Sequence, residues 1–143
     1  MKGIWKNDSE ASDGILLYFH GNSDNCYSYL YMADAFCKHL DVSHVFISDY
    51  RSFGESNTFL RPSDKQIEVD AEAAFSHAMD KRKDFNLQDC PIYLYGHSLG
   101  AYPALYLASK HPEITSVTIA NPFYNLRSLV YTAAPFLLKW SFL

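Results

Sequence analysis

The sequence has little of what marks a nucleic-acid-binding protein. Its 143 residues include 12 Lys and Arg against 16 Asp and Glu, which gives a formal net charge of −4. The one dense basic run is Lys81-Arg82-Lys83, and three such residues within a polar stretch are typical of a solvated helix face rather than a phosphate-binding surface. We therefore expect no nucleic-acid partner.

Cysteines are few as well. There are three, Cys26, Cys37 and Cys90, so they cannot all form disulfides within the chain. Their spacing is not that of a metal site. Such cysteines are typical of small core residues in a reducing compartment. We expect a cytoplasmic protein with no metal and no cofactor.

The sequence also has neither the hydropathy pattern of a signal peptide nor an apolar run long enough to span a membrane. Residues 1–8 turn polar too soon to form the apolar part of a signal peptide. The apolar tail, residues 129–143, is shorter than the roughly 18 residues of a spanning helix, and it contains Pro135 and Lys139. A buried or interfacial helix is the expectation for this tail.

Short apolar runs recur along the chain, separated by longer segments. Their continuous apolar character is that of strands buried on both faces by flanking helices. They are residues 15–19, 45–47, 92–95 and 117–120. A remnant of a further strand is indicated at residues 3–6, and the length fits a single domain, residues 1–143.

Helical segments lie between the apolar runs. The first has an apolar face made of Cys26, Leu30, Ala33, Cys37 and Leu40. Ser23 or Asp24 is its expected cap, the second segment begins with a capping-box pattern at residues 63–66, and the third runs from Ser98 to about His111. This alternation predicts right-handed crossovers and an α/β fold, a three-layer, doubly wound, mostly parallel sheet.

The third apolar run ends in a G-x-S-x-G motif, Gly96-His97-Ser98-Leu99-Gly100. A strand leads into the motif and a helix leads out, which is the context of a nucleophile elbow. Bulk at Gly96 or Gly100 would collide with neighbouring backbone in so tight a turn. The motif predicts Ser98 as a nucleophile at a helix N-terminus, and the alternative is a simple turn with a capping serine.

A second motif, Phe19-His20-Gly21-Asn22, ends the first of these runs. Glycine lets the backbone turn so that the Asn22 N–H faces the site, where it would pair with the N–H of Leu99 in a two-donor oxyanion hole. Taken alone, Gly21-Asn22 is better explained as an ordinary turn. Two compatible turns, 78 residues apart and separated by two crossovers, favour the oxyanion interpretation.

With these motifs the chain resembles the α/β-hydrolase family. The matching segments are residues 17–22, 48–56 and 93–100, in the order of the family, and the likeness runs from about Ile15 to Leu143. The chain looks most like the small-capped, serine-aminopeptidase-like members, which include membrane-associated esterases and protein depalmitoylases. Residues 49–54 match a loop that is mostly structural in the family, so Asp49 is expected to be a turn and hydrogen-bonding residue.

The resemblance implies a serine hydrolase that cleaves ester, thioester or related acyl bonds. Ser98 matches the acylated nucleophile, and Asn22 matches the residue that lends an oxyanion N–H. The implied substrate is a small or lipid-like acyl compound, and contact with a membrane surface is part of the expectation.

The histidine and the acid of a catalytic triad are not found. In the family they follow the serine, but after Ser98 this sequence offers only His111 and Glu113, about 20 Å away along a helix. Asn121 stands where some relatives place the acid. The sequence therefore predicts that a C-terminal portion or a partner chain completes the site, and the alternative is a non-catalytic hydrolase-like binding protein or an inactive fragment.

Overall fold

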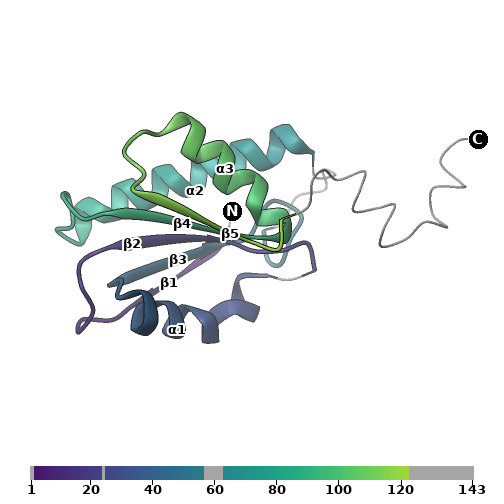
Figure 1. Ribbon diagram of the computed structural model, residues 1–143. Helices are drawn as coiled ribbons and strands as arrows, with labels where there is room; N and C mark the ends of the chain where they lie inside the picture. Colours follow the sequence, from purple (N-terminus) through teal and green to yellow (C-terminus); the bar gives the residue numbers. More distant parts are fainter. Residues whose placement is uncertain (1, 24, 57–62, 123–143) are drawn as a thin grey trace, which may run out of the picture.

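A computed structural model describes residues 2–23, 25–56 and 63–122. The apolar tail at residues 129–143 lies outside the described residues, so its helical expectation stays a prediction. The described part forms a five-stranded sheet in the order β1-β3-β2-β4-β5, with helices on both faces (Figure 1). The predicted α/β fold with a mostly parallel sheet is confirmed.

The strands lie where the apolar runs predict them. They are β1 (Gly3–Asn7), β2 (Ile15–Phe19), β3 (His44–Ser48), β4 (Ile92–His97) and β5 (Ser116–Ala120). The segment predicted as a strand remnant is a full strand, β1, which pairs antiparallel with β3, whereas every other pairing is parallel. Tyr18 pairs with Ile47 of β3 and with Tyr95 of β4, so β2 lies in the middle of the sheet.

In the described part of the chain, three helices cover the sheet in two layers. Helix α1 (Leu30–Leu40) lies on one face, and α2 (Asp64–Asp84) and α3 (Ala101–Lys110) lie together on the other (Figure 1). Successive residues of β2 alternate between the two cores: Leu17 packs with residues of α2 and α3, and Leu16 packs with residues of α1. The Ser63 side chain caps α2 by accepting a hydrogen bond from the Gln66 N–H, as the capping pattern predicts.

The start of the first helical segment differs from the prediction. Cys26–Tyr29 forms a 3-10 turn, and the side chain of Asn25, rather than Ser23 or Asp24, accepts from the N–H groups of Tyr27 and Ser28. Leu30 and Leu40, expected on the buried face, are 41% and 51% exposed. The 3-10 turn has three residues per turn instead of 3.6, so it shifts the face that the helix presents to the sheet.

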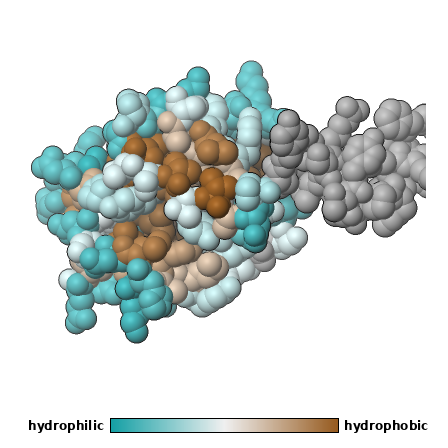
Figure 2. Space-filling model, in the orientation of Figure 1, coloured by the Kyte–Doolittle hydropathy of each residue, from teal (hydrophilic) through white to brown (hydrophobic). Residues whose placement is uncertain are grey.

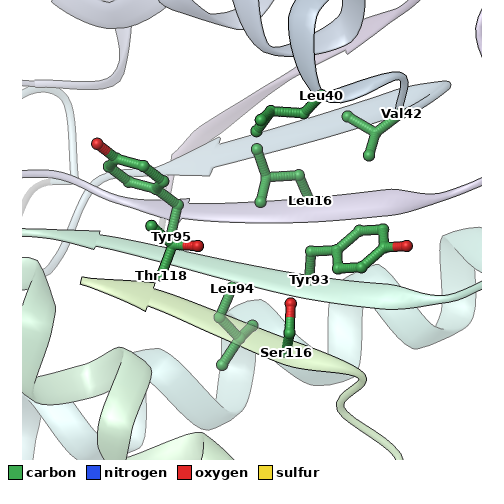
Figure 3. A pocket seen from close by; sticks show the side chains of 8 residues that line it. All are labelled: Leu16, Leu40, Val42, Tyr93, Leu94, Tyr95, Ser116 and Thr118. Atoms are coloured by element: carbon green, nitrogen blue, oxygen red, sulfur yellow. The ribbon is translucent and has the colours of Figure 1, made fainter. Parts of the chain in front are cut away.

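The α1 side of β4 and β5 is partly open to solvent in the described part of the chain. Helix α1 packs on β1 and β3, and α3 packs on the other face of β4 and β5. A cavity of about 250 Å³ opens on the α1 side (Figure 3). It is lined by Leu16, Leu40, Val42, Tyr93, Leu94, Tyr95, Ser116 and Thr118. Hydrophobic residues also gather across the middle of the molecular face seen in Figure 2.

Candidate active site

Ser98 has an unusual backbone conformation at the end of β4. Its φ is 52°, in the left-handed region that residues with a Cβ rarely adopt. The chain then continues as a 3-10 turn, Ser98–Gly100, directly into α3. A serine thus occupies a sharp strand-to-helix turn, and local backbone strain of this kind clusters at functional sites.

The two glycines of the motif permit close backbone packing around this turn. A Cβ on Gly96 would lie 2.8 Å from the Cα of Ala101, and a Cβ on Gly100 would overlap the carbonyl oxygen of Phe19. Gly100 therefore lets the start of α3 lie against the end of β2. Any side chain at these positions would force backbone atoms apart.

The turn that follows β2 lies beside Ser98. A Cβ placed on Gly21 would lie 3.6 Å from the Ser98 Cβ and 3.3 Å from Nδ1 of His97. The register explains this, because Phe19 pairs with Gly96 and both strands then end at the same edge of the sheet. Asn22 is exposed at this edge, whereas Leu99 is buried. The fold brings together the two motifs that the sequence singled out.

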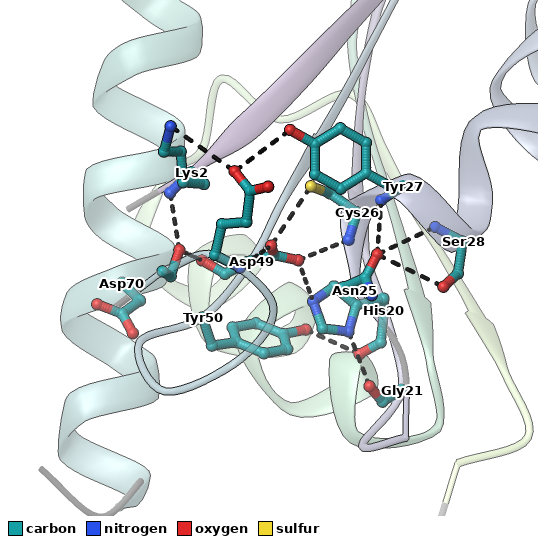
Figure 4. A network of polar contacts seen from close by, with 12 residues as sticks. Lys2, His20, Gly21, Asn25, Cys26, Tyr27, Ser28, Asp49, Tyr50 and Asp70 are labelled. Atoms are coloured by element: carbon teal, nitrogen blue, oxygen red, sulfur yellow. Dashed lines mark hydrogen bonds and ion pairs between the residues drawn. The ribbon is translucent and has the colours of Figure 1, made fainter. Parts of the chain in front are cut away.

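A buried polar network supports the turn after β2 (Figure 4). His20 and Asp49 are both fully buried, and Nε2 of His20 lies 3.4 Å from Oδ1 of Asp49. On the other side of the ring, Nδ1 of His20 lies 2.7 Å from the Gly21 carbonyl oxygen. The Tyr50 hydroxyl donates to the carbonyl oxygen of His20 at 3.0 Å.

The Asp49 carboxylate accepts hydrogen bonds from groups on both sides of it in the sequence. It accepts from the N–H and the thiol of Cys26 and from the N–H of Glu55. Gly54, with φ of 49°, passes so close that any Cβ there would overlap the Asp49 carboxylate. These contacts agree with the turn and hydrogen-bonding role implied by the resemblance.

Burial changes the acid–base chemistry of this network. Burial, and secondarily the Asp49 charge, raise the pKa of the Cys26 thiol to about 12. Burial also raises the pKa of Tyr50 well above its usual range. Both groups therefore stay protonated near neutral pH, which suits them to donate hydrogen bonds rather than to act as nucleophiles.

His111 lies at the opposite end of α3 from Ser98. Its ring nitrogens contact the carboxylates of Glu72, at 2.9 Å, and of Glu113, at 3.4 Å. The contact with Glu72 joins the end of α3 to α2, which gives His111 a structural place far from the serine.

His97 and Asn121 lie side by side after β4 and β5. Nε2 of His97 is 3.4 Å from Nδ2 of Asn121, and Nδ1 of His97 is buried with no hydrogen-bond partner among the described residues. Asn121, like Ser98, has a left-handed backbone, with φ of 50°. The position expected for a triad acid in some relatives thus lies next to His97.

The sequence interpretation missed the pairing of His20 with Asp49. The two residues directly follow neighbouring parallel strands, and the pairing of Tyr18 with Ile47 places them opposite one another two residues later. A histidine and an aspartate at adjacent strand ends were the available signal. Recognising it required the register of β2 on β3.

The described residues hold neither a metal-type cluster nor a membrane-spanning helix. No group of His, Cys, Asp and Glu side chains within them has the arrangement of a metal site. None of the helices that the structure describes has the length and apolar character to cross a bilayer.

Comparison with known proteins gives matches over most of the chain. The family described as "Serine aminopeptidase, S33" matches residues 10–142. An uncharacterised membrane protein of Saccharomyces cerevisiae is 31% identical over 97% of the chain and 47% of its own length. Alpha/beta hydrolase domain-containing protein 17C of Xenopus laevis is 32% identical over 82% of the chain and 35% of its own length.

Solved structures share the fold. A monoglyceride lipase of Saccharomyces cerevisiae, in complex with a substrate analogue, superposes with a TM-score of 0.75 at 17% identity, over 96% of this chain and 46% of the lipase. A carboxyl esterase of Bacillus coagulans, in complex with glycerol, gives a TM-score of 0.69 at 16% identity, with the same two coverages. The chain spans about half, or less, of the length of the proteins it matches here.

Proposed function

Because the chain belongs to the serine aminopeptidase S33 family of α/β-hydrolases, we propose that it carries the nucleophile half of a serine hydrolase site. The reaction is the cleavage of an ester, thioester or related acyl bond, with Ser98 as nucleophile. One observation carries the proposal: the strained Ser98 turn lies against the turn that contains Gly21, with 3.6 Å between the Ser98 Cβ and a Cβ placed on Gly21.

The chemistry follows from these two turns. A base removes the Ser98 hydroxyl proton while Oγ bonds to the acyl carbon, and the carbonyl oxygen becomes an oxyanion. The N–H groups of Asn22 and Leu99 donate to that oxyanion. The bond to the leaving group then breaks, the leaving group takes up the proton, and water hydrolyses the acyl-enzyme.

A histidine and an acid beyond residues 1–143 complete the site in this proposal. His111 is held at the far end of α3 by Glu72 and Glu113, which removes it from the chemistry. We assign residues 1–143 to the first part of one α/β-hydrolase domain, and the greater length of the relatives leaves room for the remainder.

The proposed substrate is a small or lipid-like acyl compound. The carboxyl esterase and the monoglyceride lipase, which share this fold, are named for acyl substrates. We place the protein in the cytoplasm with contact to a membrane surface, and the yeast relative named as a membrane protein supports that contact.

The test is reaction of the complete protein with a fluorophosphonate and with activated esters of different chain length. Ser98→Ala should abolish labelling and turnover and leave the melting temperature close to that of the wild type. Ser109→Ala, on the exposed part of α3, is the matched control and should react normally. Absence of labelling in the wild-type protein would favour the alternative, a hydrolase-like binding protein.

A further inference from the structure

We propose that His20 is the positioning residue of the oxyanion turn. Its ring holds the Gly21 carbonyl oxygen, and this contact fixes the direction in which the Asn22 N–H points. The inference rests on the proposed function, since it concerns the donor assigned there to the oxyanion.

The contact with the Gly21 carbonyl defines the protonation of one ring nitrogen. A carbonyl oxygen can only accept a hydrogen bond, so at 2.7 Å Nδ1 of His20 must carry a hydrogen and donate it. The Gly21 carbonyl is thereby turned toward the buried ring, as Figure 4 shows.

Peptide geometry carries this orientation to the next residue. The Gly21 carbonyl and the Asn22 N–H belong to one peptide unit, and the described chain has no cis peptide bond. In a planar trans peptide the N–H points opposite to the C=O. Holding the carbonyl toward the interior therefore directs the Asn22 N–H outward, and Asn22 itself is exposed.

The ring can fix the carbonyl only if the ring is itself fixed. Nε2 of His20 faces Oδ1 of Asp49 at 3.4 Å, and the ring packs on that of Tyr50, with 4.7 Å between centroids. Asp49 is in turn held by the N–H groups of Cys26 and Glu55.

A purely structural role explains this pair less well. Burying a charged or strongly polar pair contributes little to stability, because the desolvation of both groups offsets their attraction. The His20 and Asp49 side chains are nevertheless both at 0% exposure. We assign the pair a geometric role, because His20 holds the Gly21 carbonyl, which shares a peptide unit with the Asn22 N–H.

Two variants of the complete protein separate the two sides of the ring. In His20→Asn the side-chain amide takes the place of Nδ1 and can still donate to the Gly21 carbonyl. In His20→Gln the amide takes the place of Nε2 and faces Asp49 instead. If His20 positions the Asn22 N–H, His20→Gln should lower kcat on an activated ester by about 10–100-fold with little change in KM, since a whole oxyanion donor is worth about 100–1,000-fold. His20→Asn should retain most of kcat. Equal loss in both variants, or no loss in either, would overturn the proposal.

A spectroscopic arm does not depend on turnover. Nitrogen-15 NMR of wild-type protein should show a proton on Nδ1 of His20, and the Asn22 amide resonance should shift in His20→Gln but not in His20→Asn. An unprotonated Nδ1 of His20 in the folded wild-type protein would overturn the proposal even if the enzyme is active. If no ester is hydrolysed, the proposed function fails while these signals still decide the role of His20.

Discussion

Backbone conformation at single residues is where the candidate site departs most from ordinary structure. Five non-glycine residues among those described have positive φ: Asp41, Ser52, Asn86, Ser98 and Asn121. Asp41 directly follows helix α1, where a left-handed residue commonly ends a helix. Ser98 instead joins a strand to a helix, so its conformation has no such general explanation and carries a local strain energy.

The strain at Ser98 leads to a prediction for Ser98→Gly. Glycine adopts φ of 52° without a Cβ clash, whereas an L-residue there costs about 1–2 kcal/mol. Ser98→Gly should therefore raise the free energy of unfolding by about 1 kcal/mol while it removes the hydroxyl. Urea denaturation beside Ser98→Ala, which keeps the Cβ, measures the difference; equal midpoints for the two variants would argue against strain.

The Cys26 thiol predicts a loss of stability at alkaline pH. Its pKa is about 12 in the folded chain against an ordinary 9.0, so the folded state binds the proton more tightly. This contribution is fully present below pH 9 and is lost as the pH rises from 9 toward 12. Burial also raises the pKa values of Tyr18 and Tyr50, so their ionisation lowers the stability of the folded state further at still higher pH.

Chemical denaturation at pH 8, 9.5 and 10.5 tests this prediction with Cys26→Ala beside the wild type. The wild-type midpoint should fall more steeply than that of the variant over this range. Parallel curves would show that the thiol does not titrate with unfolding.

Contacts between elements hold the two turns of the site together. Gly100 at the start of α3 touches the backbone at the end of β2, and Gly96 pairs with Phe19 across the same junction. The site thus depends on how α3 and β2 meet, rather than on either element alone.

Adding a methyl group at this junction should be costly. In Gly100→Ala the Cβ overlaps the Phe19 carbonyl oxygen, which is backbone and cannot rotate away, so a loss of about 1–3 kcal/mol is expected. Gly100→Val should be worse. Gly14→Ala is the matched control, because its Cβ would meet side chains at an ordinary 3.4 Å. The melting temperatures of the three variants test the order, and an unchanged value for Gly100→Ala would contradict the close packing.

Individual elements were more predictable from the sequence than their contacts. Continuous apolar runs such as residues 15–19 identify buried strands because that pattern reflects burial on both faces. The predicted cap of the first helical segment was wrong. Ser23, Asp24 and Asn25 are all good capping residues, and only tertiary packing decides which of them caps the segment. The pairing of His20 with Asp49 was missed because it depends on strand register, to which local sequence is blind.

At the scale of the whole molecule, the described residues cover the two faces of the sheet unequally. Thr118 and Ser116 are exposed on the α1 side of β5, and Tyr93 and Tyr95 beside them are half-buried around the cavity in Figure 3. A parallel sheet usually has both faces covered. The yeast and Xenopus relatives named above are about twice as long as this chain or longer, which is enough for further covering elements.

We therefore predict that residues 1–143, expressed by themselves, associate or aggregate and show no acyl burst. Strand β5 is last in the strand order of the described residues, and the free edge of such a strand offers unpaired backbone groups to other chains. Sedimentation velocity and burst kinetics on an activated ester measure both properties, with Ser98→Ala as the blank. A monomer with a stoichiometric, Ser98-dependent burst would contradict the prediction and would demand a base within these residues.

The antiparallel strand β1 gives the beginning of the chain a mechanical link to the site. The backbone N–H of Lys2 donates to the Ser56 hydroxyl at 2.7 Å, and its carbonyl accepts from the N–H of Asp49 at 2.9 Å (Figure 4). Asp49 then reaches His20, and His20 reaches the Gly21 carbonyl. Three successive contacts thus connect the residue that precedes β1 to the turn beside Ser98, so the position of the first strand and the geometry of the site are coupled.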